Sequence, residues 1–337
     1  MKRLLISVFV IALISTAALA SDIDRQDSSS TFQTMDETES IIFGQSMTGG
    51  LIERLSKVEV ALFGRELPGS IAARQTALID FIEKGNQEQP SMLFKLGVAE
   101  WALSQRVDAY GPVDKRIAFL ESSLEGQTME SKPLAMRLER LLSLLIGDNV
   151  TWQDVEIPSD CVMKASLLET LSPSSAKAGD HVRMSLKDDL IVGTCLIAPK
   201  GSKIEGHISE VKRPKSFGRP SEISISFDSL VPLGPENIPI VMGEASEKAS
   251  KAESSQVAAV GTSFVGAVLL GPVGLAGGLL VRGNAKEVPE GTAFFVQTPE
   301  VVRVSGYPVP MGLQGMIPSP AASEDSGDIL EEVTIGQ

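Results

Sequence analysis

Apolar residues recur at helical spacing through the first half of the chain. Two stretches carry the same stripe, in which four apolar residues are separated by four, three and four positions: Leu51, Leu55, Val58 and Leu62, and Leu134, Leu138, Leu141 and Leu145. This spacing places four side chains on one face of an α-helix. A helix this short is not stable by itself in water, so each one must pack against neighbours.

These helical stretches belong to a sequence repeat. Six positions match twenty residues apart, with Glu39, Phe43, Gly44, Gly49, Leu51 and Arg54 followed by Glu59, Phe63, Gly64, Gly69, Ile71 and Arg74. A looser copy has one residue inserted in its loop and runs through Glu121, Leu124, Gly126, Leu134 and Arg137. Glycine directly after a helix suits the left-handed conformation that ends it. We therefore predict a region of short helical repeats over 39–150, with one further helix over 90–107.

The recurrent arginine of this repeat has two interpretations. Ten residues separate it from the glycine that ends its helix, as at Arg54 and Gly64. Its side chain either contacts a ligand or is a solvated or glutamate-paired group on the polar helix face, and the second interpretation is favoured. Trp101 is interpreted as a core residue. The motif Ala61-Leu-Phe-Gly64 resembles short helical repeats at the N-terminus of exported bacterial proteins, a resemblance that informs architecture alone.

Residues 158–305 change to the two-residue alternation of β-strands. Alternating segments run over Val182–Leu186, Ile204–Ile208 and Ile223–Phe227, and β-branched apolar segments run over 191–197 and 294–304. Glycine- and proline-rich turns separate them. About six to eight short strands with regular turns predict a small antiparallel barrel or sandwich. The expected fold class is therefore α+β, with helical repeats before the β domain.

A Pro-x-Gly-Ser or Pro-x-Gly-Thr strand start occurs on either side of an insert, at Pro199–Ser202 and Pro289–Thr292. With these motifs, residues 177–304 resemble a family of uncharacterised exported bacterial proteins whose β-barrel is interrupted by a glycine-zipper hairpin. They are more distantly similar to the barrel of the TrbI-type scaffold of conjugation and type IV secretion channels. The resemblance implies a barrel that displays an inserted helical hairpin. The chain lacks the long proline-rich arm of those channel scaffolds, and its helical N-terminus is unrelated to theirs.

The insert, expected over 244–287, contains 25 consecutive residues without a charge, 257–281. That length is sufficient for a membrane span. Pro272 interrupts a helix near the middle of this stretch, so an apolar hairpin of two short helices is favoured over one rod. Three interpretations stay open. The hairpin enters a membrane or self-associates, it folds back as an apolar cover on the barrel, or it spans a membrane.

Two groups of residues are candidates for contact with the envelope. Glycine faces permit close helix packing, so the residues expected to form the membrane or self-association hairpin are Gly261, Phe264, Gly266, Leu270, Gly271, Pro272, Gly274 and Gly278. A basic patch falls in an expected hairpin loop and consists of Lys212, Arg213, Lys215 and Arg219. It is interpreted as a solvated loop, with contact to an acidic polymer or to lipid headgroups as the alternative.

The first twenty residues predict export. Lys2 and Arg3 precede an apolar run and an Ala-x-Ala site, the pattern of a secretory signal peptide cleaved before Ser21. An uncleaved membrane anchor is the alternative. Residues 21–38 are rich in Ser, Asp and Thr, and residues 311–337 are acidic, so both segments are predicted to be disordered.

Export bears on the cysteines, because exported proteins meet an oxidising environment. The chain has two cysteines, Cys161 and Cys195, which therefore form a candidate disulfide. Two separate buried thiols are the alternative, since sequence alone does not place their Cα atoms within bonding range.

Composition and motifs exclude several classes of function. The chain has 30 Lys and Arg against 43 Asp and Glu, a net charge of −13, which argues against nucleic-acid binding. Two histidines and two cysteines are too few for a zinc framework. No nucleophile elbow, Walker loop or dinucleotide fingerprint occurs. Asp188 and Asp189 are adjacent and are interpreted as a turn or strand edge rather than as an acid/base pair.

Together these patterns predict a non-enzymatic protein of the periplasm or cell envelope, without catalytic residues, metal or cofactor. It is expected to act as an interaction or assembly scaffold whose apolar hairpin associates with a membrane or with a second copy. Expected partners are a membrane surface, an envelope protein or a homo-oligomer, and no nucleic acid. A secretion-channel component and a wall-acting hydrolase without a local motif are the alternatives.

Overall fold

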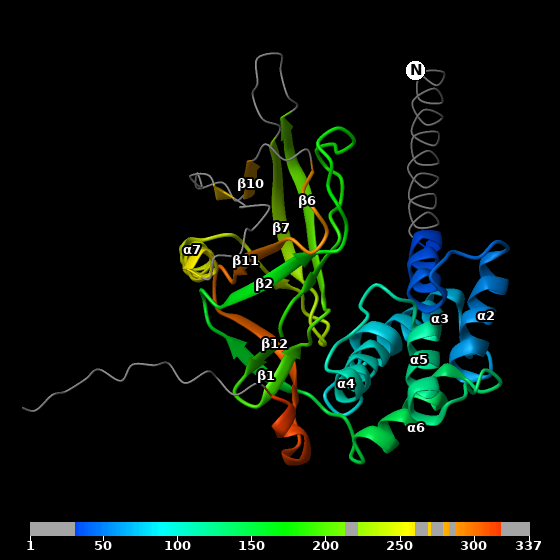
Figure 1. Ribbon diagram of the computed structural model, residues 1–337. Coiled ribbons are helices and arrows are strands. Elements are labelled where there is room, and N and C mark those ends of the chain that lie inside the picture. Colours follow the sequence, from blue (N-terminus) through cyan, green and yellow to red (C-terminus); the bar gives the residue numbers. More distant parts are fainter. Residues whose placement is uncertain (1–30, 213–221, 260–268, 271–278, 283–286, 318–337) are drawn as a thin grey trace, which may run out of the picture.

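The computed structural model describes residues 31–212, 222–259, 269–270, 279–282 and 287–317. Within them, the chain has the expected α+β fold, with a layer of helices followed by two curled antiparallel sheets (Figure 1). The expected signal peptide, 1–20, lies outside the described residues.

The helical layer consists of units that begin 20 or 21 residues apart, as expected for a repeat. A helix at 31–43 is followed by α2 (Leu51–Phe63), α3 (Ile71–Ile79) with a π-helical end at Asp80–Lys84, α4 (Met92–Ser104), α5 (Val113–Glu125) and α6 (Leu134–Leu145). The predicted apolar stripe is buried at Leu55, Val58 and Leu62. Gly64 ends α2 with φ of 74°, and its amide donates to the Val60 carbonyl, which confirms the predicted glycine cap.

The disorder expected over 21–38 is wrong for its last eight residues, because the helix already begins at residue 31. Met35, Thr38, Glu39 and Ile42 are buried at helical spacing, so one face of this polar stretch packs into the core. The average composition of the segment concealed this period. Residues 21–30 lie outside the described residues.

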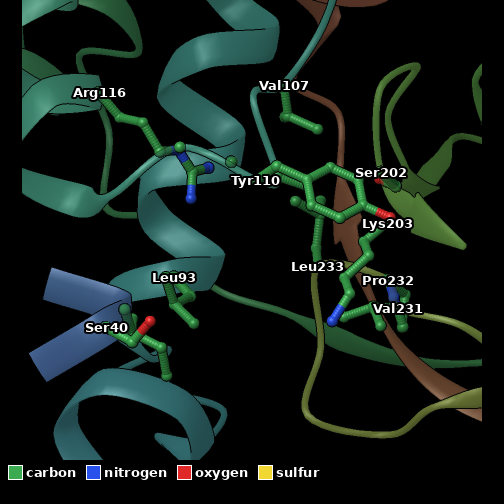
Figure 2. A pocket seen from close by; sticks show the side chains of 14 residues that line it. Ser40, Leu93, Val107, Tyr110, Arg116, Ser202, Lys203, Val231, Pro232 and Leu233 are labelled. Atoms are coloured by element: carbon green, nitrogen blue, oxygen red, sulfur yellow. The ribbon is translucent and has the colours of Figure 1, made fainter. Parts of the chain in front are cut away.

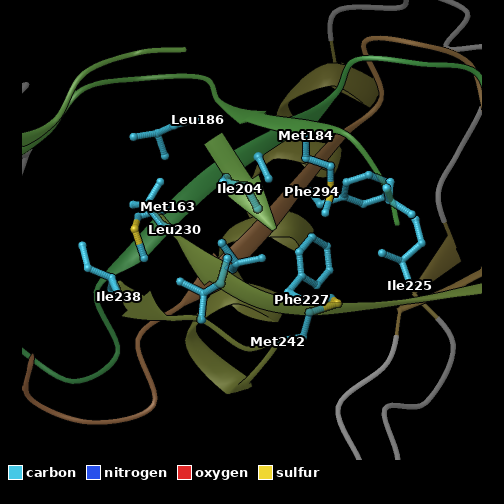
Figure 3. Close-up of a cluster of buried hydrophobic side chains, with 14 of the residues drawn as sticks. Met163, Met184, Leu186, Ile204, Ile225, Phe227, Leu230, Ile238, Met242 and Phe294 are labelled. Carbon is cyan, nitrogen blue, oxygen red and sulfur yellow. The ribbon is translucent and has the colours of Figure 1, made fainter. Parts of the chain in front are cut away.

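The β region contains a sheet of order β1-β12-β5-β4 and a larger one of order β11-β2-β3-β6-β7-β10-β9, with β8 beside β7. Their main strands are β1 (Gln153–Ile157), β2 (Val162–Leu167), β3 (Met184–Leu186), β4 (Leu190–Val192), β5 (Cys195–Ala198), β6 (Lys203–Lys212), β7 (Glu222–Leu230), β8 (Ile238–Pro239), β11 (Ala293–Gln297) and β12 (Val302–Pro308). Alternate residues of β2, β3 and the first part of β6 are buried, whereas all four residues of β5 are buried. Figure 3 shows Ile204, Ile225 and Phe294, all from the larger sheet, among the buried side chains of the core of the β region.

The insert differs from the expected helical hairpin. It begins with α7 (Glu244–Ala259), which packs on β2 and β11 (Figure 1), but its later described parts are the strands β9 (Leu269–Leu270) and β10 (Leu279–Arg282). β10 pairs antiparallel with β7, Leu279 lying opposite Ile225. Large apolar residues favour strand pairing, and the edge of β7 supplies partners for their backbone groups. In the parts of the chain that the structure describes, no helix is both long and apolar enough to cross a membrane.

The predicted disordered tail, 311–337, also begins with regular structure. Met311–Met316 is a 3₁₀ helix, and Leu313, Met316 and Ile317 pack against the apolar core of the helical layer. These apolar residues distinguish the start of the segment from its acidic remainder. Residues 318–337 lie outside the described residues.

Candidate functional site at the joint of the two regions

Buried ion pairs link successive helices. A glutamate near the end of one helix accepts two hydrogen bonds from an arginine in the first turn of the next, at 2.5–2.9 Å, in the pairs Glu39–Arg54, Glu59–Arg74, Glu100–Arg116 and Glu121–Arg137. The same glutamate accepts from a backbone amide eight residues further on, at Met47, Leu67, Asp108 and Met129 respectively. Each carboxylate therefore holds a helix, the following loop and the next helix together.

Pairing also shifts the pKa values of the charged groups. The hydrogen bond that Arg74 donates to Glu59 raises the pKa of Arg74. Burial alone raises the pKa of Glu121, but the hydrogen bonds from Arg137 and from the Met129 amide outweigh it and lower that pKa. The interpretation of the recurrent arginine as glutamate-paired is confirmed, but the pair is buried rather than solvated. Each buried arginine and glutamate therefore has an oppositely charged hydrogen-bond partner.

The pairing is interrupted once, between α3 and α4. Ile79 occupies the position of the glutamate in α3, and Lys95 occupies the position of the arginine in α4. Lys95 instead lies 2.5 Å from Glu139 of α6. Both members of the pair are absent together, which is expected because either one alone would be an uncompensated buried charge. The helix expected over 90–107 is thus a further copy of the repeat, since its Glu100 pairs with the next helix.

The loop between α4 and α5, residues 105–112, attaches the helical layer to the β region. The Val107 amide donates to the Lys200 carbonyl at 2.8 Å. The Tyr110 hydroxyl donates to the Met184 carbonyl at 2.9 Å, and the Arg183 guanidinium lies 4.7 Å from the centre of the Tyr110 ring. We call this contact region the joint.

A tryptophan–aspartate hydrogen bond completes the joint. Nε1 of the buried Trp101 donates to Asp189 at 2.8 Å, and the other oxygen of Asp189 accepts from the Lys200 amide at 2.6 Å. Trp101 is a core residue, as expected. Asp189 lies between β3 and β4, and its function in linking the two regions was not predicted from sequence.

Both regions also share one apolar core. Leu196, Leu233, Tyr307 and Val309 of the β region belong to the buried cluster of the helical layer. Gly97 of α4 permits a close approach, because a Cβ atom there would lie 2.4 Å from a methyl group of Leu233. The shared core and the polar contacts make the joint a continuous interface.

The joint contains a cavity of about 310 Å³, shown in Figure 2. Its walls come from the first described helix, α4, the 105–112 loop, α5 and two segments of the β region. The lining residues are Ser40, Ile41, Leu93, Gly97, Val107, Ala109, Tyr110, Gly111, Arg116, Ser202, Lys203, Val231, Pro232 and Leu233. The cavity size falls at the lower end of the range of small-molecule sites.

The candidate disulfide is not formed, and both cysteines are free thiols. Cys195 begins β5 opposite Pro308 and accepts a hydrogen bond from Gln153, the first residue of β1. Cys161 lies beyond the other end of β1, where its amide donates to Thr298. Four strand steps of about 3.3 Å separate the ends of β1, whereas a disulfide requires Cα atoms within about 7 Å. Burial raises the pKa of the Cys161 thiol.

Most of the predicted hairpin and basic-patch residues lie outside the described residues: Gly261, Phe264, Gly266, Gly271, Pro272, Gly274, Gly278, Arg213, Lys215 and Arg219. Of the others, Leu270 is in β9, and Lys212 ends β6 with its ammonium 3.3 Å from Glu210. Both predicted sites therefore stay predictions.

The two histidines lie opposite each other, although the sequence suggested no relation between them. His181 pairs across the sheet with His207, whose Nδ1 lies 3.0 Å from Asp228. The nearby Glu205 has a lowered pKa, mainly because Lys203 donates to it. Among the described residues, no cluster of three or more His, Cys, Asp or Glu side chains is arranged to hold a metal ion.

Comparisons with known proteins give a distant similarity. No known protein family matches the chain, and no curated protein does. Among solved structures, the chain is similar to ComB10 of the Com type IV secretion system of Helicobacter pylori, with 18% identity and a TM-score of 0.22. This similarity covers 46% of the present chain and 92% of that chain. At this level it assigns no activity or partner.

Proposed function

We propose that this protein is a non-enzymatic, exported scaffold of the cell envelope that binds a protein partner through its helical layer. The observation that carries the proposal is a set of large apolar side chains exposed on neighbouring helices. Export is inferred from the sequence of residues 1–20.

The exposed apolar residues are concentrated on three helices. Each is 49–60% exposed, and the set consists of Ile52 and Val60 on α2, Phe119 on α5, and Met136 and Leu144 on α6. Both α2 and α5 pack against α6, so these helices are neighbours. We call these five residues the helical surface. Several large exposed apolar groups on adjacent elements mark interaction surfaces more often than isolated ones do.

The rest of the molecule supports a rigid display of this surface. The buried ion pairs fix each helix to the next, and the joint fixes the helical layer to the β region. The preorganised surface therefore loses little conformational entropy when it binds a partner.

The β region supports the second element of the proposal, which is membrane or self-association through the insert. The N-terminal end of the insert is held by α7. Lys164 of β2 lies 2.5 Å from Glu253 of this helix, and the Ser246 amide donates to Gln297 of β11. The C-terminal end of the insert is held by the pairing of β10 with β7. Both attachments are made to strands of the β region.

The test is the native mass of the full-length protein after mild solubilisation of envelopes. We expect the wild type in an assembly larger than one chain, and the double variant Phe119→Ser, Met136→Ser at the mass of a single chain. The matched control is Ser123→Ala, Ser143→Ala, which changes two exposed polar residues of α5 and α6. A wild type with the mass of one chain would overturn the proposal, as would a double variant with unchanged mass.

Membrane association is tested separately by replacing residues 260–278 with a Gly/Ser linker of the same length. This change leaves α7 and β10 in place. We expect the variant to leave the membrane fraction. Retention of the variant there would contradict association through the insert but not the proposed helical surface.

A further inference from the structure

The cavity at the joint combines apolar walls with unused hydrogen-bond donors. Its apolar lining includes Ile41 and Leu93 from the helical layer and Val231 and Leu233 from the β region. Among the described residues, the charged side chains of its lining are those of Arg116 and Lys203. Figure 2 shows these two side chains extending into the cavity region from different sides.

Arg116 is held in place and still has a donor available. Its Nε and Nη2 donate to Glu100 at 2.9 and 2.7 Å, which fixes the guanidinium. Its Nη1 has no hydrogen-bond partner among the described residues. Glu100 does not line the cavity, so the carboxylate holds the guanidinium from outside it.

Lys203 has a similar arrangement. Its ammonium lies 2.8 Å from Glu205, and its side chain is 40% exposed, which leaves further N–H groups accessible. Glu205 also lies outside the cavity lining. The other polar lining side chains are the hydroxyls of Ser40, Ser202 and Tyr110. The described lining thus contains cations and hydroxyls but no carboxylate.

We propose that this cavity binds a small ligand with a carboxylate at one end and a short apolar body. The carboxylate accepts a hydrogen bond from Lys203 Nζ, Arg116 adds a second positively charged donor to the lining, and the apolar body packs against Leu93, Val231 and Leu233. Because both cations already have carboxylate partners, recognition depends on free donors and apolar contact rather than on net positive charge. Charge-assisted hydrogen bonds of this kind are stronger than those between neutral groups.

The cavity volume limits the size of the ligand. A water molecule takes about 30 Å³ in the liquid, so about ten non-hydrogen atoms fit in about 310 Å³. Octanoate has this size. Because both regions line the cavity, the bound ligand contacts both and stabilises their attachment, which raises the melting temperature.

The test is calorimetric titration of the full-length protein with octanoate and, separately, with 1-octanol. We expect saturable binding of octanoate at millimolar concentration or below, and weaker binding of the alcohol. Lys203→Ala is expected to weaken octanoate binding by about tenfold or more, as for other lost hydrogen bonds to charged groups, and to leave octanol binding unchanged. The matched control is Lys187→Ala, an exposed lysine outside the lining, which is expected to bind like the wild type.

A second variant keeps the test independent of charge. Ala109→Phe places a ring in the cavity and is expected to abolish binding of both compounds while the protein stays folded by circular dichroism. If it unfolds, Lys203→Ala alone decides. Any of three results would overturn the proposal. The wild type does not bind octanoate, it binds octanol with equal affinity, or Lys203→Ala binds octanoate with unchanged affinity. A short peptide with an apolar C-terminal residue, titrated as free acid and as amide, distinguishes a chain terminus from a free acid as the source of the carboxylate.

Discussion

The helical layer and the β region are stabilised over very different distances along the chain. Each buried ion pair of the helical layer joins residues 15 or 16 positions apart, as in Glu59–Arg74 and Glu121–Arg137. In the β region, the first and last main strands pair with each other, Gln153 lying opposite Gly306. The helical layer is therefore assembled from local units, whereas the β region forms only when distant segments meet.

Because of this difference, some substitutions should destabilise a single repeat, whereas others should destabilise both regions. A change to an ion pair tests the local units, and a change at the joint tests their attachment to the barrel.

Breaking one buried ion pair is expected to have the largest effect. Glu121→Ala leaves Arg137 as a buried uncompensated cation, so the free energy of unfolding should fall by about 3–5 kcal/mol, measured by urea denaturation. The control is Glu125→Ala, which removes the partner of the more exposed Arg140 and should lower it by less than about 1 kcal/mol. Similar losses in the two variants would contradict the central role of the buried pairs.

Crowding the joint is expected to have the next largest effect. Gly201 has φ of 93°, and a Cβ atom there would lie 2.1 Å from the Val107 carbonyl oxygen. Gly179 has φ of 92° with open space around it, so Gly179→Ala carries the backbone strain alone. We expect Gly201→Ala to lower the free energy of unfolding by about 1–3 kcal/mol more than Gly179→Ala. Equal losses of unfolding free energy in the two variants would show that the joint accommodates the added methyl group without cost.

Removing the Trp101–Asp189 hydrogen bond tests the polar part of the joint. Asp189→Ala leaves the buried indole N–H without its acceptor, and the free energy of unfolding should fall by about 1–3 kcal/mol. The control is the neighbouring exposed residue Asp188. Asp188→Ala should change the free energy of unfolding by no more than about 0.5 kcal/mol. Tryptophan fluorescence during unfolding measures both. A larger loss in Asp188→Ala would contradict the assignment of Asp189 to the joint.

Tyr307 gives the smallest expected effect, and its sign depends on pH. Burial, aided by the negative charge of Asp148, raises the pKa of Tyr307 to about 12 from 10.0. A raised folded-state pKa gives stability that is present below pH 10 and lost as the pH rises towards 12.

The buried hydroxyl of Tyr307 has no hydrogen-bond partner in the described structure, so Tyr307→Phe should be neutral or stabilising at pH 7. Unfolding measured from pH 9 to 12 should show a shallower loss of stability in Tyr307→Phe than in the wild type. An unchanged slope would contradict the raised pKa.

Local periodicity made several features predictable. The stripe at Leu55, Val58 and Leu62 and the cap at Gly64 depend on neighbouring residues, so the pattern contained the necessary information. The Glu-to-Arg spacing was also present in the sequence, at 15 or 16 positions, and comparing it across copies would have identified the buried pairs. Averaging composition over 21–38 instead concealed the helical face that includes Met35.

Long-range features were not predictable in this way. No local pattern connects Tyr110 with Met184, or Trp101 with Asp189, because these contacts exist only once helices and strands have packed. Export to an oxidising compartment favoured a disulfide between the two cysteines, but in the folded chain the length of β1 separates them. The pairing of β10 with β7 likewise depends on an available strand edge, which the apolar composition of the insert does not reveal.

The α+β order, the helical repeat with its glycine ends and the alternation of the strands were predictable from sequence, because each follows from interactions between residues close together in the chain. Tertiary structure alone decided the burial of the ion pairs, the attachment of the two regions at Val107, Tyr110 and Asp189, and the cavity between them. Burial of a charge and availability of a donor depend on which surfaces meet when the chain folds. Arg116 and Lys203 are ordinary charged residues in the sequence, and they share one cavity because the folded helical layer rests on the barrel.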